Sequence, residues 1–298
     1  MSTPRFSVVV PSRNRPDALA ACLEALAELD DPGDGFEVIV VDDGSRAPIE
    51  PVARAFRDRL RLRVVRLPGR GPAAARNAGI EIAVGEYVAF TADDCLPQRD
   101  WLSALAARFT ADPAAGVGGR IENRMPHNVF STSTDLLLRR LYDYHNQPPE
   151  RARFFTPNNL AFPLAPLREV GGFLDALETG EDRELCDRWR GGGRRLVYAA
   201  EAVVGHVHPL GFASFLHLHY RYGKGSSGFR REAARRGSEA ARFEPVSFYL
   251  GLIRYPLSVY RGARGLALSG LMCVAQVANA VGYLRQSLTR PGTAGRAR

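Results

Sequence analysis

A run of four aliphatic residues, Val38-Ile39-Val40-Val41, constrains the fold of this chain more than any other stretch. The run is rich in β-branched residues and does not alternate with polar ones, which is typical of a strand buried on both faces of a parallel sheet. Asp42-Asp43-Gly44-Ser45 follow it directly. Ligands of open α/β sheets bind outside the carboxyl ends of the strands, so the two carboxylates are expected at such an edge. The same residue types are also typical of a turn followed by a helix cap.

Strand and helix patterns alternate along the first 112 residues, which predicts a doubly wound, mostly parallel α/β sheet flanked by helices. After residue 112 the strand and helix patterns no longer alternate regularly, and from residue 212 the chain has helical patterns only. We expect a catalytic domain over 1–210, made of halves 1–112 and 113–210, and a helical C-terminal extension over 211–298. The expected strands are 6–10, 36–41, 62–67, 87–90, 117–124, 156–162, 196–199 and 203–208, and the expected helices are 18–29, 48–59, 73–83, 101–109 with Asp100 as N-cap, 131–144 and 181–190.

The positive charge is concentrated at the C-terminal end. The net charge is +8, yet the residues after His208 hold 14 Lys and Arg against 3 Asp and Glu. A basic surface of this kind favours an anionic partner, either a membrane or a nucleic acid. The four cysteines form no C-x-x-C pair and no signal peptide precedes the first strand, which fits a cytoplasmic protein.

The C-terminal end is also apolar, with twenty uncharged residues from Gly265 to Leu284. That is the length of a membrane span, but the run contains polar residues and glycines, and a single span would oppose the positive-inside tendency. We therefore expect helices that lie on the inner face of the cell membrane and no binding to nucleic acid. A helical hairpin and a homodimer interface are the alternatives.

A second acidic pair, Asp93-Asp94, follows the strand predicted over 87–90, as Asp42-Asp43 follows the earlier one. Carboxylates at such an edge can hold a divalent cation that bridges a diphosphate, with Arg76 beside the same phosphates. The alternative for each pair is solvated loop charge.

The chain resembles the family 2 glycosyltransferases, which have the GT-A fold and invert the anomeric centre. The resemblance covers residues 5–225 and depends on the order and spacing of several motifs. The matching segments are Val8-Val9-Val10-Pro11-Ser12-Arg13-Asn14, Val40-Val41-Asp42-Asp43-Gly44-Ser45, Gly71-Pro-Ala-Ala-Ala-Arg76-Asn77-Ala-Gly79, Gly85-Glu86-Tyr87-Val88-Ala89-Phe90, Gly171-Gly172-Phe173 and Glu181-Asp182.

The resemblance implies a role for each matching residue. Asp94 matches the metal ligand of the D-x-D motif, whose first position is Ala92 here, and Asp182 matches the general base. Asp43 would accept a hydrogen bond from the nucleotide base, and a histidine at the end of a late strand would join the metal site. The residues expected to bind the nucleotide sugar are Pro11, Ser12, Arg13, Asn14, Asp43, Arg76 and Asp93; those expected to bind the acceptor are Asn158, Asn159 and Glu181; the metal ligands are Asp94, His206 and His208.

The predicted activity is transfer of a sugar from a nucleotide-diphosphate donor to the hydroxyl of a glycan or lipid-linked acceptor, with Mg²⁺ or Mn²⁺, in cell-envelope glycan synthesis. A nucleotidyltransferase and a non-catalytic binding protein are the alternatives. Gly223-Lys224-Gly225-Ser226-Ser227-Gly228 has the G-x-G-x-x-G pattern but lacks the surrounding βαβ unit of a dinucleotide site. We therefore interpret it as a glycine-rich break between basic helices.

Overall fold

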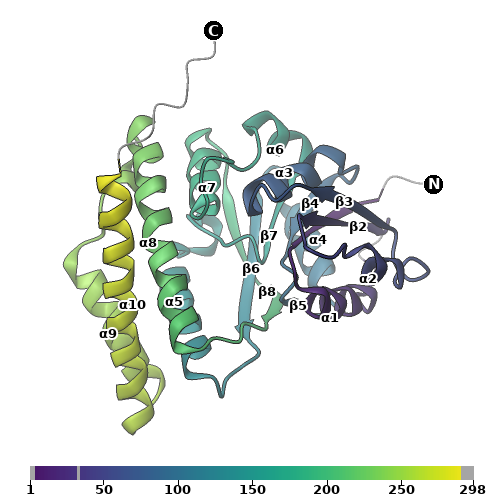
Figure 1. Cartoon of the computed structure of the whole chain (residues 1–298). Helices are drawn as coiled ribbons and strands as arrows, with labels where there is room; N and C mark the ends of the chain where they lie inside the picture. The colour runs from purple at the N-terminus through teal and green to yellow at the C-terminus, as the bar shows by residue number, and fades with distance from the viewer. Residues whose placement is uncertain (1–3, 32–33, 290–298) are drawn as a thin grey trace.

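In the computed structural model, which describes residues 4–31 and 34–289, the chain forms an eight-stranded sheet with helices on both faces (Figure 1). The strand order is β3-β2-β1-β4-β7-β6-β8-β5. The strands are β1 (Phe6–Ser12), β2 (Phe36–Asp43), β3 (Leu62–Leu67), β4 (Tyr87–Phe90), β5 (Cys95–Pro97), β6 (Gly116–Asn123), β7 (Leu160–Pro163) and β8 (Leu196–His206).

The direction of the strands divides the sheet into two parts. Strands β3, β2, β1 and β4 are parallel to one another, which confirms the doubly wound prediction for the first half of the chain. Strand β7 is antiparallel to both β4 and β6, whereas β6 and β8 run parallel to each other. Strand β5 adds an antiparallel edge beside β8.

Two hydrophobic clusters cover the two faces of the sheet. Phe6, Val8 and Val10 of β1 point into one cluster, and Val9 points into the other. Helices α1 (Pro16–Ala27), α2 (Glu50–Arg54) and α4 (Trp101–Ala111) pack on the first face. Helices α3 (Pro72–Ile82), α6 (Leu164–Val170) and α7 (Glu181–Gly191) pack on the second. The alternation within β1 is what a strand buried on both faces requires.

Most of the predicted elements are present, with several differences. The helix expected over 48–59 is regular only in α2. The strands expected over 196–199 and 203–208 are a single strand, β8. The pairing of β8 with β6 is irregular between Gly119 and Arg120 of β6. Asp100 does precede α4, but its side chain makes no capping hydrogen bond. Strand β5 was not predicted from the sequence.

Four long helices form a bundle beside the sheet, at the left of Figure 1: α5 (Val129–His145), α8 (Phe212–Arg235), α9 (Val246–Val259) and α10 (Gly262–Leu288). Leu136 of α5, Leu252 of α9 and Met272 of α10 belong to one buried cluster. Two 3₁₀ turns, Pro149–Arg151 and Glu239–Ala241, complete the elements. Among the described residues only α10 is long and apolar enough to cross a bilayer, and 28% of its most apolar window is buried within the protein.

The glycine-rich stretch at 223–228 lies inside α8, so the prediction of a break between helices was wrong. A Cβ on Gly223 would lie 1.9 Å from the carbonyl oxygen of Asn279, and one on Gly282 would lie 2.0 Å from that of Tyr220. These two glycines therefore allow α8 and α10 to pack with their backbones in contact. The helix continues through the glycines because close packing compensates for their low helix propensity.

Candidate active site

The first two strands end in a network of turns. Ser12 of β1 is buried and lies opposite Asp42 of β2, and Pro11, partly buried, lies opposite Val41. Asp42 accepts a hydrogen bond from the backbone N–H of Ser45 at 2.9 Å, so it has the turn role that is usual for these residue types.

Asp43 is buried, and both of its carboxylate oxygens accept backbone hydrogen bonds. The N–H groups of Arg70 and Gly71 donate to them at 2.7 and 2.9 Å. Gly44, with φ +75°, lets this loop approach, because a Cβ there would lie 2.6 Å from the backbone nitrogen of Gly69. Asp43 therefore fixes the loop that precedes α3 at the end of the sheet.

Arg13 and Asn14 lie at the same edge. The Nη1 atom of Arg13 is 4.0 Å from the Asp43 carboxylate, and more than half of the Arg13 side chain is exposed. Asn14 has φ +56°, its N–H donates to the hydroxyl of Ser45, and its side-chain oxygen accepts from the N–H of Arg46. The structure thus brings together the predicted residues at the ends of β1 and β2.

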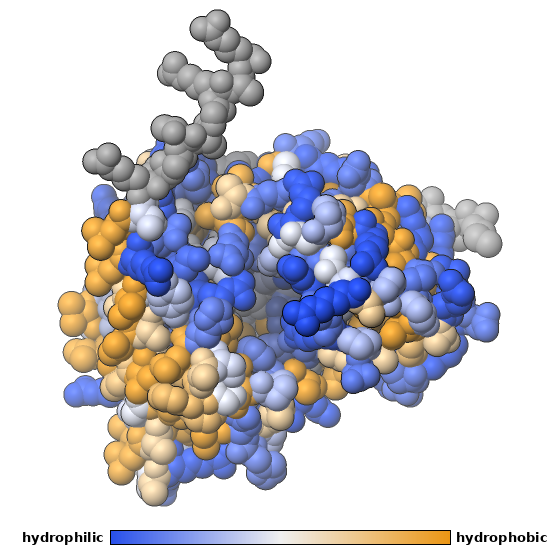
Figure 2. All heavy atoms as spheres, in the orientation of Figure 1, coloured by the Kyte–Doolittle hydropathy of each residue, from blue (hydrophilic) through white to orange (hydrophobic). Residues whose placement is uncertain are grey.

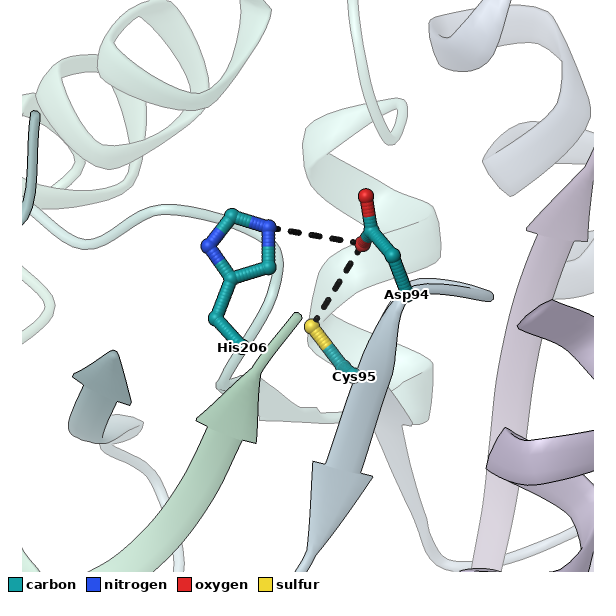
Figure 3. Close-up of side chains that lie close together, drawn as sticks. All are labelled: Asp94, Cys95 and His206. Atoms are coloured by element: carbon teal, nitrogen blue, oxygen red, sulfur yellow. Dashed lines mark hydrogen bonds and ion pairs between the residues drawn. The ribbon is translucent and has the colours of Figure 1, made fainter. Parts of the chain in front are cut away.

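A candidate cation site lies where β5 meets β8. Figure 3 shows Asp94, Cys95 and His206, whose ligand atoms lie within 4.8 Å of one another. His206 Nε2 is 3.5 Å from Asp94 Oδ1, and Cys95 pairs directly with His206 in the strand register. Burial raises the pKa of the Cys95 thiol well above its usual value, so the thiol is neutral and is a poor metal ligand. Asp94 and His206 remain as the potential ligands.

His208 lies next to this pair, with its ring centroid 4.9 Å from that of His206. Burial and the charge of His206 lower the pKa of His208 to about 4, which keeps its imidazole neutral. Both histidines line the cavity described below.

Arg15 provides a test of whether this site suits a cation. Its guanidinium lies 2.7 Å from Asp94 Oδ2 and 3.3 Å from Asp93 Oδ1. Burial tends to raise the pKa of Asp94, but its contacts with His206 and Arg15 outweigh burial and hold that pKa well below the usual range. For Asp93 burial dominates and raises the pKa to about 6. The carboxylates of Asp93 and Asp94 thus already bind one positive charge, the guanidinium of Arg15. The carboxylate oxygen of Asp94 and the imidazole nitrogen of His206 are suitable ligands for Mn²⁺ or Mg²⁺. The donor set therefore fits a divalent cation.

A buried ion pair joins α3 to α7. Arg76 Nη1 lies 2.8 Å from Glu181 Oε1, and each side chain is less than a tenth exposed. The pair places Arg76 beside Asp182, the next residue of α7. Burial, followed by the charge of Glu181, raises the pKa of Asp182 to about 7. A carboxylate with a pKa in this range is suited to act as a general base near neutral pH.

One large cavity, of about 1210 Å³, connects the ion pair and Asp182 with the two histidines. It lies between the sheet and the helical bundle, where Figure 2 shows a hollow near the centre of the molecule. Arg76, Glu181 and Asp182 line it from one side and His206 and His208 from another. It also has a lining of arginines from α7 and α8, which sequence reasoning did not place in the site.

The two predicted amide residues have different environments. Asn158 lines the cavity, whereas Asn159 is fully buried. The side chain of Asn159 donates to the carbonyl oxygens of Arg120 and Ala202 and accepts from the indole N–H of Trp101. The prediction that Asn159 binds the acceptor is therefore corrected, because all of its polar groups hold the core together.

Comparison with known proteins adds an independent line of evidence. The family model described as glycosyl transferase family 2 matches residues 7–171. The pre-mycofactocin glycosyltransferase of Mycobacterium tuberculosis is 33% identical over 212 residues, which cover 68% of this chain and 42% of that protein. The chain thus spans less than half the length of that relative.

Solved structures share the fold. The mannosyltransferase PcManGT of Pyrobaculum calidifontis, solved with GDP-Man and Mn²⁺, has a TM-score of 0.66 and 21% identity, over 94% of this chain and 87% of that one. Residues 1–349 of S. aureus TarS, solved with UDP-GlcNAc, have a TM-score of 0.56 and 19% identity, over 95% and 90% of the two chains. The GT-A-type fold predicted from the sequence is confirmed.

Proposed function

This chain belongs to glycosyl transferase family 2, and from that premise we propose that it transfers a sugar from a nucleotide-diphosphate donor to an acceptor hydroxyl with inversion at the anomeric carbon. The observation that carries the proposal is the shared cavity: Asp182, with a pKa raised to about 7, lines it together with His206 of the cation site. A base that can take the proton of the acceptor and a charged site that can hold the leaving group therefore line the same cavity.

The proposed reaction is a single displacement. The acceptor oxygen attacks the anomeric carbon while the bond from that carbon to the β-phosphate oxygen breaks. The proton of the acceptor hydroxyl passes to a carboxylate oxygen of Asp182, and the nucleoside diphosphate leaves with the bonding electron pair. Asp182 can accept this proton because its burial beside Glu181 increases its basicity relative to an ordinary aspartate.

On the donor side, we assign the nucleoside to the network at the ends of β1 and β2, around Pro11, Arg13 and Asp43. Asp94 and His206 would hold a Mg²⁺ or Mn²⁺ ion, with His208 beside them. When bound, such an ion would neutralise negative charge on the diphosphate. In this assignment the nucleoside network and Asp94 belong to the half 1–112, and the two histidines come from the half 113–210.

We further propose that the enzyme works on a glycan or lipid-linked acceptor at the inner face of the cell membrane. Exposed apolar side chains are concentrated on α9 and α10, and this area is orange at the left of Figure 2. On α10 the last four of them are spaced by three or four residues, and the first lies about three helical turns earlier, so they lie along one side of the helix. The exposed set is Val246, Leu250, Leu257 and Val259 on α9 and Leu266, Val277, Val281, Leu284 and Leu288 on α10. A group of exposed apolar side chains like this one favours contact with a membrane or with a second subunit.

The test is to incubate the protein with UDP- and GDP-sugars and Mn²⁺ and to identify the nucleotide product. A glycosyltransferase releases nucleoside diphosphate, whereas a nucleotidyltransferase would form or consume pyrophosphate. A thermal-shift screen with nucleoside diphosphates selects the base first, since a ligand at 100 times its Kd adds about 2.7 kcal/mol of stability. If no nucleoside diphosphate binds and none is released from any donor, the proposal fails.

A further inference from the structure

Six arginines that line the cavity have no carboxylate within 4.0 Å among the residues that the structure describes. Four of them are half-buried, and we call three of these, Arg183 on α7 and Arg221 and Arg230 on α8, the arginine wall. The acids that share the lining are mostly paired with other residues. Asp135 pairs with Arg139, Glu178 with Lys224, Glu181 with Arg76 and Asp187 with Arg236.

The side chains of the arginine wall have few polar partners. The Nε atoms of Arg221 and Arg230 are buried and have no hydrogen-bond partner within the described part of the chain. Arg230 donates only to the hydroxyl of Ser226 and stacks 4.3 Å from the ring of Phe243, and Arg183 stacks 4.8 Å from the ring of Phe154. Stacking orients a guanidinium but leaves its N–H groups available, and the guanidinium fork matches the oxygens of a phosphate.

The environment of His145 indicates that these charges converge. Burial, together with the positive charges of Arg183, Arg153, Arg190 and Arg230, lowers the pKa of His145 to about 3. The nearest acid is Glu244, 3.9 Å from its ring. This part of the cavity is therefore strongly positive, which an anionic group bound there would offset.

Apolar side chains line the rest of the cavity, on the side of the helical bundle. Leu284 and Phe243 line the cavity, yet they are 60% and 61% exposed. Leu284 belongs to the exposed apolar set on α10, so the apolar lining continues onto the outer surface. Other large apolar side chains of the lining include Leu137, Leu138, Leu141, Phe229, Phe248, Leu252 and Tyr283.

We propose that the cavity is the acceptor site and that the acceptor is an amphiphile, in which the group that carries the acceptor hydroxyl is joined to a phosphate bound by the arginine wall and, through it, to an apolar chain lying along α5, α9 and α10. The proposal deepens the proposed function, on which it rests. The phosphate would be held near Asp182, since Arg183 is the next residue of α7, and its chain would leave the cavity at Leu284 and Phe243.

The first test compares three ligands on the unmodified protein, each below its critical micelle concentration, by isothermal titration calorimetry. Dodecyl phosphate has both features, inorganic phosphate has only the anion, and dodecyl maltoside has only the chain. We expect dodecyl phosphate to bind at least about tenfold more tightly than either of the others. Equal affinity for inorganic phosphate would overturn the chain site, and equal affinity for dodecyl maltoside would overturn the anion site.

The second test uses Arg221→Gln and Arg230→Gln, with Arg235→Gln as the matched control. Arg235 lies on the same helix and carries the same charge, but it pairs with Glu232 at the surface. Loss of one charge-assisted hydrogen bond should weaken dodecyl phosphate binding by roughly tenfold or more in the first two variants and leave the control unchanged. An equal loss in the control would contradict a local site.

Binding of nucleoside diphosphate with Mn²⁺ separates this inference from the proposed function. If the two wall variants lose nucleotide affinity as much as dodecyl phosphate affinity, the arginine wall belongs to the donor site and the inference is wrong. If nucleotide binding and nucleoside diphosphate release are absent while dodecyl phosphate binding depends on the wall, the glycosyltransferase proposal fails and the anion site remains.

Discussion

The proposed general-base role of Asp182 gives the sharpest prediction, and the test is the substitution Asp182→Asn. Asparagine keeps the shape of the side chain and one acceptor oxygen, which in the wild type accepts from the backbone N–H of Arg183 at 2.8 Å. It removes the ability to take a proton. Transfer should fall on the order of 10² to 10⁴-fold, as is usual for loss of a general base, while donor affinity is unchanged.

The raised pKa of Asp182 predicts the direction of the pH dependence. A carboxylate with a pKa of about 7 is protonated, and so inactive as a base, below that pH, and it is ionised above it. Its ionised fraction, and with it kcat/KM, should therefore rise about tenfold between pH 6 and pH 8. Besides burial, the charged groups that shift the pKa of Asp182 are Glu181 and Arg183 on α7 and Arg76 on α3. Tyr142 on α5 and Tyr222 on α8 also face it, since the charge of Asp182 helps to raise the pKa of each tyrosine.

A coupled assay for nucleoside diphosphate, run at several pH values, measures both effects. Asp182→Ala serves as the comparison, because it also removes the hydrogen bond at the start of α7 and should cost about 1 kcal/mol of stability. If Asp182→Asn keeps near wild-type transfer and only Asp182→Ala loses stability, Asp182 is a helix-terminal residue and the base assignment is refuted. A wild-type profile that is flat between pH 6 and 8 would refute it as well.

Three further outcomes are expected. Mn²⁺ should tighten nucleoside diphosphate binding in the wild type but not in Asp94→Asn, and an equal metal response in both proteins, measured by calorimetry, would remove Asp94 from the cation site. Gly223→Ala should destabilise the protein by about 1–3 kcal/mol in denaturant unfolding, because the added Cβ would overlap the backbone of α10. The control Gly270→Ala, whose Cβ would meet open space on α10, should be neutral or stabilise the protein by up to about 1 kcal/mol. Replacing both Val277 and Val281 with serine should reduce sedimentation with anionic vesicles by at least about tenfold, since full burial of one valine contributes roughly 1.5 kcal/mol; a shift in oligomeric state instead would assign this face to a dimer.

Local patterns predicted the first half of the fold because β1, β2 and β4 each contain a run of at least three apolar residues, and β3, at the edge, alternates apolar residues with arginines. The same patterns contain no information on strand order, so the antiparallel placement of β7 between β4 and β6 could not be predicted. Strand β5 is three residues long, too short to show any period. The glycines of α8 were interpreted as a break because their contact with α10 joins residues more than fifty positions apart.

The candidate site shows a similar limit. The motifs indicated which residues carry charge, but not how those charges are paired. Arg76 was expected beside phosphates and is paired with Glu181, and Arg15, which contacts Asp93 and Asp94, was not singled out at all. The arginines of α8 were noted as a basic cluster expected to face a membrane, whereas several line the cavity. Only the fold determines which side of a helix faces inward.

The location of the arginine wall has an evolutionary consequence. The segment that matches the family model ends at Gly171, so α7, α8 and the whole wall lie beyond it. Under the proposed assignment, the arginines that would bind the phosphate and the strands that would bind the nucleoside lie on separate stretches of the chain, whereas Arg76 and the leucines of α5 in the same cavity belong to the first stretch. Relatives can keep the first stretch nearly intact while the second diverges to accept a different molecule. An acceptor should accordingly be inferred by comparing the cavity-facing positions of α7 and α8, and similarity across the strands is a poor guide to it.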